Sequence, residues 1–250
     1  MGLGDAAGAA AAIAAVLALS GCGATERAPA PTPAPRAFVP APTAVEPSDP
    51  APRPRHTTAE LVRRTPLRAR PGGRVLRRLG TRTEFGSASV LSVSASRGGW
   101  LRVATPLLRN HRRGWIRASA TRLLGTDYDI RIDRSRRSAA LRRDGRVVLR
   151  FSVAVGRPGN ETPLGRFAVT DKLKTTDATS PYGCCALALT GHQPRLVPGW
   201  PGGDRLAIHG TPAAETIGQA VSLGCLRAPT TALRRLMRRV PLGMPVVIKA

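Results

Sequence analysis

The sequence predicts a mainly β protein with one short helix near its C-terminal end. Short apolar runs are separated by glycine-rich turn signals, such as Pro-Gly-Gly at residues 71–73 and Arg-Gly-Gly at residues 97–99. Over residues 147–155 every second residue is apolar, which is the period of a half-buried strand. Near the C-terminus, apolar residues recur at helical spacing over residues 233–240. Strands therefore dominate the prediction, and the helix is its one exception.

The first folded region is expected over residues 57–124, with strands at 89–93, 100–103 and 114–116. Five or so short strands suggest a small barrel. The order of three segments resembles a bacterial SH3-like domain: TPLRARP at 65–71, GGWLRV at 98–103 and GWI at 114–116. Trp100 and Trp115 are interpreted as core aromatics, and a ligand-binding role is the alternative.

The second region, residues 125–250, carries the alternating strand and further strand candidates at 166–170, 205–208 and 246–248. A helix is expected between the last two. Thr230 or Thr231 is predicted to cap it, and Pro241 with Gly243 to end it. Its apolar face is formed by Leu233, Leu236, Met237 and Val240.

A compact span of this region holds the residues of a thiol nucleophile. His209 and Gly210 lie in the run Ile-His-Gly-Thr, and Cys225 follows sixteen positions after the histidine in the run Val-Ser-Leu-Gly-Cys-Leu-Arg. A free cysteine holds little thiolate at neutral pH, so a neighbouring imidazole that takes the proton and holds the ion pair would activate it. Gly224, directly before the cysteine, lets the backbone turn and aim N–H groups at an oxyanion.

These residues resemble the L,D-transpeptidase (YkuD-type) catalytic domain, whose motif is a histidine followed by Ser/Thr-His-Gly-Cys, a hydrophobic residue and Asn or Arg. His209 matches the first histidine, and Ser222, Gly224, Cys225 and Arg227 match the nucleophile loop. Leu223 stands where the family usually has its second histidine. The segment TPLGRF at residues 162–167 is similar to the family's Thr-Pro-x-Gly-x-Phe turn, and the resemblance covers residues from about 126 to 250. It implies a β-sandwich with a short C-terminal helix.

The resemblance also implies roles for individual residues. Cys225 would be the nucleophile and His209 the general base, with the Gly210 carbonyl orienting the imidazole. The backbone N–H groups of Leu223, Gly224 and Cys225 would stabilise the oxyanion. Arg227 would engage a substrate carboxylate or brace the loop, a loop salt bridge being the alternative. Ser222 belongs to the same loop, and His192 and Tyr182 are candidates for the substrate groove, with a plain loop residue as the alternative for His192.

The remaining cysteines have other expected roles. Cys184 and Cys185 are adjacent, a geometry that strains a direct disulfide, so buried thiols near the active site or one labile bridge are expected. A zinc site built from Cys184, Cys185, Cys225, His209 and His192 is disfavoured because no Cys-x-x-Cys or His-x-x-x-His spacing is present. No metal and no cofactor are therefore predicted.

The N-terminal residues predict export. Residues 6–20 are apolar but shorter than the roughly 20 residues of a membrane span, so they read as the core of a signal peptide at residues 1–22. Leu-Ser-Gly-Cys at 19–22 resembles a bacterial lipobox with Cys22 as the lipidated residue; an ordinary cleaved signal is the alternative. Residues 23–56 contain ten prolines and almost no large apolar side chains, so a disordered tether is expected, able to span up to roughly 100 Å. The predicted location is extracytoplasmic, as a membrane-anchored lipoprotein that faces the cell wall.

The chain is strongly basic, with a formal net charge of +24. A nucleic-acid partner is set aside because an exported chain meets little nucleic acid and no arginine-rich segment shows interleaved aromatic residues. Over residues 61–150 arginines outnumber acidic residues 23 to 5. This surface is expected to attract anionic wall polymers such as teichoic acids, or anionic lipid, and a solvated basic face is the alternative.

Together these observations favour a peptidoglycan L,D-transpeptidase. By the resemblance, Cys225 would form a thioester with the third residue of a donor stem peptide, and an amine of an acceptor stem would resolve it. Two alternatives remain open at this stage. Water could resolve the same acyl-enzyme, which would make the protein an L,D-carboxypeptidase, or Leu223 could mark a catalytically dead cell-wall-binding lipoprotein.

Overall fold

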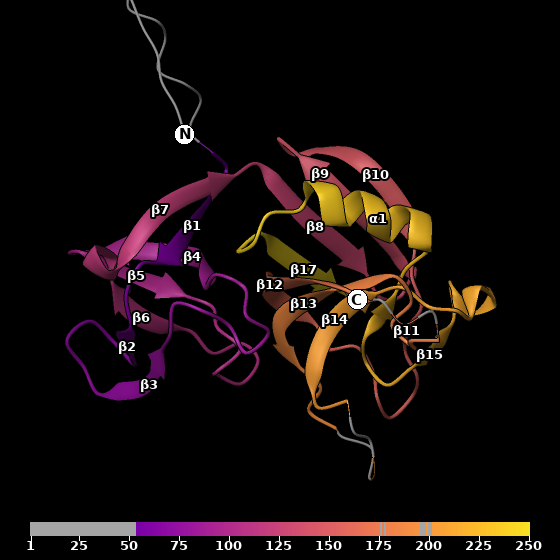
Figure 1. The fold of residues 1–250 in the computed structure, drawn as a ribbon, viewed down its shortest axis with the longest axis horizontal. Coiled ribbons are helices and arrows are strands. Elements are labelled where there is room, and N and C mark those ends of the chain that lie inside the picture. Colours follow the sequence, from indigo (N-terminus) through magenta and orange to yellow (C-terminus); the bar gives the residue numbers. More distant parts are fainter. Residues whose placement is uncertain (1–53, 176, 178, 196–198, 200–201) are drawn as a thin grey trace, which may run out of the picture. The chain divides into compact units, whose positions relative to one another are not determined.

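A computed structural model describes residues 54–175, 177, 179–195, 199 and 202–250. The predicted signal peptide, the lipobox with Cys22, and the tether up to residue 53 lie outside the described residues. The described residues form one compact unit. The fold is mainly β with a single described α-helix near the C-terminus, as the sequence predicts (Figure 1). No helix of the described chain is long and apolar enough to cross a membrane.

The first seven strands form one antiparallel sheet in the order β3-β2-β6-β5-β4-β1-β7. A short 3-10 helix, η1 (Ala118–Ala120), precedes the last of them. The core of the sheet is apolar and includes Leu61, Leu67, Leu101 and Ile116. The strands are β1 (His56–Leu61), β2 (Thr65–Arg68), β3 (Val75–Leu79), β4 (Val90–Arg97), β5 (Trp100–Val103), β6 (Gly114–Arg117) and β7 (Thr121–Thr126).

The predicted strands of this region are present at β4, β5 and β6, and β1 begins at the last residue of the predicted tether. The turn between β4 and β5 is the predicted Arg-Gly-Gly signal, in which Gly98 and Gly99 both have positive φ. Trp100 is buried, with the Arg117 guanidinium 4.1 Å from the centre of its ring, which confirms a core position. Trp115 is only partly buried. The assignment of an SH3-like domain stays a prediction.

Eight strands form the second sheet, in the order β10-β9-β8-β17-β12-β13-β14-β16. The pairs β8–β17 and β14–β16 are parallel, and the others are antiparallel. A separate parallel pair joins β11 (Val155–Gly156) to β15 (Ala220–Ser222), and η2 (Ala214–Thr216) is a 3-10 turn. The sheet strands are β8 (Tyr128–Asp133), β9 (Ser138–Arg143), β10 (Arg146–Ser152), β12 (Gly165–Lys174), β13 (Cys185–His192), β14 (Arg205–His209), β16 (Leu226–Arg227) and β17 (Pro245–Lys249).

The helix α1 (Thr230–Arg239) packs on this sheet through Leu233 and Leu236, which join one core cluster with the strands (Figure 1). Burying each leucine contributes roughly 1.5–3 kcal/mol, so the apolar face at helical spacing is what holds the helix. The predicted threonine cap is wrong: the N-cap residue is Pro229, and no side chain caps the helix. Proline takes this place because its fixed φ, here −55°, suits the turn into a helix.

The prediction of a half-buried strand over residues 147–155 is only partly correct. Leu149 and Phe151 are half-buried, but Val147 is 42% exposed, as is Val148. The reason is topological: β10 is an edge strand of the sheet, and its pairing with β9 shifts register between Val147 and Leu149. The alternating pattern therefore overstates burial at the start of the strand.

The order of the strands brings the two ends of the sequence motif together. Strands β14 and β16 are parallel neighbours, with Ile208 opposite Leu226 and His209 opposite Arg227. Cys225 directly precedes β16. The fold thus places the cysteine directly before the strand that pairs with the strand ending in the histidine, although the two residues are sixteen positions apart in the sequence.

Candidate active site

Cys225 lies in a tight turn between β15 and β16. Gly224 in this turn has φ +121°, a conformation that side-chain-bearing residues rarely adopt, and a Cβ there would overlap the Gln193 side chain. The Ser222 hydroxyl closes the turn, because its Oγ accepts a hydrogen bond from the Gly224 amide (3.1 Å) and donates one to the Cys225 carbonyl (2.5 Å). The conformation of the nucleophile loop therefore depends on the positive φ of Gly224 and on the two hydrogen bonds of the Ser222 hydroxyl.

Gln193 supports the same turn from outside. Its buried side-chain amide nitrogen donates to the carbonyl of Leu223 (3.1 Å) and to the carbonyls of Asn160 (3.1 Å) and Glu161 (3.3 Å). The amide thus ties the nucleophile loop to the loop that follows β11. Sequence reasoning did not single out Gln193, because nothing in the run Gly-His-Gln-Pro distinguishes a buried glutamine from an exposed one.

His209 is the last residue of β14 and is buried, with 6% of its surface exposed. Its Nδ1 lies 2.5 Å from the Gly210 carbonyl oxygen. A carbonyl can only accept, so Nδ1 carries the proton and Nε2 keeps its lone pair. The Tyr182 ring packs edge-on against the imidazole, with 5.1 Å between the ring centres. The site therefore holds the tautomer that a general base requires.

Burial shapes the protonation of both groups. Burial lowers the pKa of His209 to about 4, with the Gly210 hydrogen bond opposing the shift and the Arg227 charge adding to it. Burial also raises the pKa of the Cys225 thiol, against a smaller lowering by a backbone hydrogen bond and by Arg227. The thiol Sγ lies 3.6 Å from the Arg205 carbonyl oxygen, which accepts its hydrogen bond. Burial therefore disfavours the charged form of both groups, and the ion pair expected from the sequence stays a prediction.

A cavity of about 230 Å³ contains the cysteine and the histidine. Three arginines, Arg195, Arg205 and Arg227, also line it, and Asp204 is the one acidic side chain among its described lining residues. The remaining lining residues are Pro181, Tyr182, Gln193, Gly202, Gly203, Ser222 and Leu223. The guanidinium of Arg227 is the one among these three that has no salt-bridge partner among the described residues, since Arg195 pairs with Glu161 and Arg205 with Glu84.

The other predicted site residues fall into two groups. Tyr182, Ser222, Leu223 and Arg227 line the cavity, and the Arg227 guanidinium lies 3.4 Å from the Thr216 hydroxyl rather than in a salt bridge with a described residue. His192 does not line it. Its Nε2 lies 2.6 Å from the Pro106 carbonyl oxygen, and its Nδ1 lies 2.9 Å from an Asp204 carboxylate oxygen.

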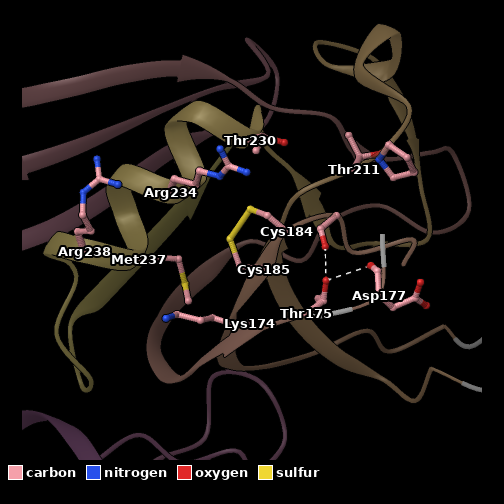
Figure 2. Close-up of a pocket in the computed structure, with 12 residues that line it drawn as sticks. Lys174, Thr175, Asp177, Cys184, Cys185, Thr211, Thr230, Arg234, Met237 and Arg238 are labelled. Carbon is pink, nitrogen blue, oxygen red and sulfur yellow. Dashed lines mark hydrogen bonds between the residues drawn. A yellow bond between two sulfur atoms is a disulfide. The ribbon is translucent and has the colours of Figure 1, made fainter. Parts of the chain in front are cut away.

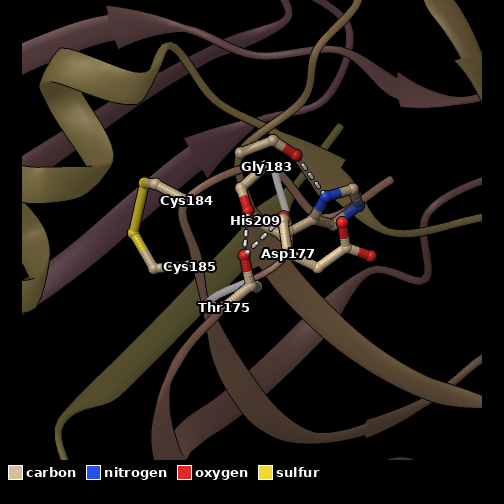
Figure 3. Close-up of a disulfide and its surroundings, with 7 residues drawn as sticks. Thr175, Asp177, Gly183, Cys184, Cys185 and His209 are labelled. Carbon is tan, nitrogen blue, oxygen red and sulfur yellow. Dashed lines mark hydrogen bonds between the residues drawn. A yellow bond between two sulfur atoms is a disulfide. The ribbon is translucent and has the colours of Figure 1, made fainter. Parts of the chain in front are cut away.

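Cys184 and Cys185 are joined in a disulfide, so of the two expectations the structure has the bridge (Figure 3). The bond lines a second cavity of about 700 Å³, together with the Gly183 turn and the α1 residues Arg234 and Met237. Figure 2 shows these two side chains on the helix beside the bond. The turn is held by the Thr175 hydroxyl, which donates to the Gly183 carbonyl (2.6 Å). Cys225 is the one free cysteine among the described residues. The same part of the chain holds no group of three or more His, Cys, Asp or Glu side chains arranged for a metal ion.

Comparisons with known proteins agree on the second region. Residues 127–248 match the family model of the L,D-transpeptidase catalytic domain, YkuD. The chain is 28% identical over 121 residues to YkuD from Bacillus subtilis (strain 168), a candidate L,D-transpeptidase, covering 48% of this chain and 65% of that protein. It is 30% identical over 112 residues to YqjB from the same organism, also a candidate L,D-transpeptidase, covering 42% and 61%.

Two solved structures are similar at lower identity. An L,D-transpeptidase from Mycobacterium tuberculosis H37Rv has a TM-score of 0.42 at 19% identity, covering 57% of this chain and 67% of that one. L,D-transpeptidase 3 from Mycobacterium tuberculosis, in complex with a faropenem-derived adduct, has a TM-score of 0.42 at 17% identity, covering 55% and 73%.

Proposed function

Because residues 127–248 belong to the L,D-transpeptidase (YkuD) catalytic-domain family, we propose that this protein cross-links peptidoglycan by acyl transfer through Cys225. One observation carries the proposal. Cys225 and His209 line one cavity, and the Gly210 carbonyl holds the His209 proton on Nδ1, which leaves Nε2 to act as the base.

The first half-reaction forms a thioester. The thiol leaves its hydrogen bond with the Arg205 carbonyl, Nε2 of His209 takes the proton, and Sγ attacks the carbonyl carbon of the third residue of a donor stem peptide. The bond to the terminal D-alanine then breaks, and the departing amine takes the proton from His209. In the second half-reaction an acceptor amine attacks the thioester and loses a proton to His209, and the thiol is restored.

The oxyanion of each tetrahedral intermediate needs N–H donors. The Gly224 amide donates to Ser222, whereas the amides of Leu223 and Cys225 have no partner among the described residues. These two amides are therefore the oxyanion donors of the proposal, and Gly224 contributes the backbone turn that aims them. Arg227, which has no salt-bridge partner among the described residues, is proposed to hold a carboxylate of the stem peptides, because Arg195 and Arg205 already pair with Glu161 and Glu84.

The experiment is incubation of the purified protein with tetrapeptide muropeptides, followed by mass spectrometry of the products. The proposal predicts dimers cross-linked between the third residues of two stems, with loss of one alanine per dimer. Loss of alanine without dimers would indicate that water resolves the acyl-enzyme, the carboxypeptidase alternative. Unchanged muropeptides would contradict both activities and favour a wall-binding protein.

The place of action is proposed to be the cell wall, with the chain held to the membrane by a lipid on Cys22. If so, the intact protein should partition into detergent, and Cys22→Ser should release it from the membrane fraction, because one lipidated cysteine carries the anchor. The measurement is Triton X-114 partitioning of both forms. An unlipidated mature N-terminus beyond Cys22 would contradict the anchor and leave an ordinary cleaved signal.

A further inference from the structure

Two loops of the first sheet contact the segment that borders the Cys225 cavity. One loop joins β3 to β4 and carries Glu84, and the other joins β5 to β6 and carries Asn110. Glu84 contacts Arg205 and Asn110 contacts His192, the two residues that flank the connection between β13 and β14. The described residues of this connection, together with Arg205, supply six of the thirteen described residues that line the cavity: Gln193, Arg195, Gly202, Gly203, Asp204 and Arg205.

The far end of the connection is fixed through Arg205, the first residue of β14. Its guanidinium donates to the Leu189 carbonyl (2.7 Å from Nη2 and 3.0 Å from Nε) and to the Thr170 hydroxyl (2.9 Å). Its remaining nitrogen, Nη1, bonds the Glu84 carboxylate. The Arg205 side chain is only 14% exposed, and Glu84 is its only acidic partner among the described residues. This partly buried guanidinium therefore has one carboxylate partner among the described residues, and that carboxylate comes from the first sheet.

The same residue contacts the nucleophile through its main chain. The carbonyl oxygen of Arg205 accepts the hydrogen bond of the Cys225 thiol at 3.6 Å. A movement of Arg205 would also move Asp204, which is bonded to it in the chain, and the start of β14, of which Arg205 is the first residue. Glu84 therefore contacts, through the Arg205 side chain, the same residue whose carbonyl accepts the hydrogen bond of the thiol.

The near end is fixed by Asn110. Its side-chain oxygen accepts from the His192 amide (2.9 Å), and its side-chain nitrogen donates to the His192 carbonyl (2.6 Å). This is the two-way pairing that a neighbouring strand would make. The His192 ring adds a contact to the Pro106 carbonyl and one to Asp204, so it links the two ends of the connection.

We propose that Glu84 and Asn110 are positioning residues for the Cys225 site: by holding Arg205 and His192, they place Asp204, Arg205 and Gln193 at the edge of the cavity. The first sheet would then help to form the substrate-binding site. The role in substrate binding rests on the proposed function, whereas the effect on the thiol does not.

The test uses the full-length protein with Glu84→Gln, which keeps the side-chain shape and removes the charge, and with Asn110→Ala. The matched control is Glu60→Gln, which removes the Glu60–Arg122 ion pair of the same sheet, away from the connection. Two quantities are measured for each: the rate of Cys225 labelling by iodoacetamide from pH 5 to 10, and KM and kcat for stem-peptide transfer.

Glu84→Gln and Asn110→Ala are expected to make the thiol more reactive at neutral pH. Without these contacts the residues at the edge of the cavity move more freely and water reaches Cys225, which lowers the pKa of its thiol. The labelling profile should move to lower pH, and KM should rise on the order of tenfold, since small misplacements of a binding group cost about this much or more. Glu84→Asp, which keeps a carboxylate, should recover part of the loss. Glu60→Gln should match the wild type in both measurements.

Unchanged labelling profiles and KM values in Glu84→Gln would overturn the positioning role, and this variant decides the question even if Asn110→Ala folds poorly. A shifted labelling profile in a protein that transfers no stem peptide, wild type included, would support the positioning role and reject the proposed function. Equal changes in Glu60→Gln would show a general loss of stability of the first sheet and would also reject the positioning role.

Discussion

Cys225→Ala is expected to abolish both the formation of dimeric muropeptides and the release of alanine. Removal of the nucleophile from an acyl-transfer enzyme typically costs about 10⁴- to 10⁶-fold in rate, because general base and oxyanion donors then act on no attacking group. No second thiol can replace it within the described chain, since Cys184 and Cys185 are bonded to each other. The measurement is the initial rate of product formation by mass spectrometry, with the intact mass of the protein followed for an acyl adduct.

Cys184→Ser is the matched control for this loss. It removes a sulfur atom from the same half of the chain but leaves the Cys225 turn, with its Ser222 and Gln193 hydrogen bonds, unchanged. It should keep most of the activity, and the adduct should remain on Cys225. Product formation by Cys225→Ala, or an adduct on Cys184 or Cys185 of the wild type, would move the nucleophile assignment to the disulfide pair.

The chemical residues of the site could be predicted from the sequence because they are encoded close together. The motif spacing alone groups Cys225, Ser222 and His209, and the parallel pairing of β14 with β16 brings the ends of that motif onto adjacent strands. The hydrophobic patterns of α1 and β5 predict these elements for a similar reason, because each pattern depends only on residues that are neighbours in the sequence. The sequence therefore indicates the nucleophile, the histidine and the serine of the turn, which lie within sixteen positions of one another.

The supporting contacts could not be predicted because they join segments far apart in the chain. Gln193 reaches the nucleophile loop thirty positions away, and Glu84 reaches Arg205 over 121 positions. Arg205 touches the thiol through a backbone carbonyl, which every residue has, so no residue type marks it. Similarly, the exposure of Val147 follows from the edge position of β10, which only the strand order reveals.

Leu223 bears on whether the site is active. Its side chain stands where relatives of the resembled family usually carry a histidine, yet its contribution to the turn is made by the main chain. Its carbonyl accepts from Gln193, and its amide is one of the two proposed oxyanion donors. A backbone role is compatible with either side chain, which is why the leucine does not by itself indicate a dead enzyme.

His209→Ala is expected to lower kcat/KM for dimer formation about 10²- to 10⁴-fold, the usual cost of removing a general base. The buried thiol, whose pKa is raised, ionises little near neutral pH without that base. Leu223→His is the control from the same cavity and should stay within about tenfold of the wild type, because the turn is held by backbone contacts. A rate increase above about a hundredfold in Leu223→His would instead indicate a degenerate site.

The pH dependence gives this prediction its sign. His209 acts as a base only when neutral, and its pKa in the free protein is about 4, so wild-type kcat/KM should fall only as the pH drops through about 4 rather than through the ordinary histidine range near 6.5. His209→Ala should lose this acidic limb. Its residual rate should instead rise steadily toward alkaline pH, following the fraction of thiolate on Cys225. The measurement is kcat/KM from pH 3.5 to 10 for both proteins. A wild-type midpoint between pH 6 and 7, or the same acidic limb in both proteins, would show that a group other than the buried His209 imidazole takes the thiol proton.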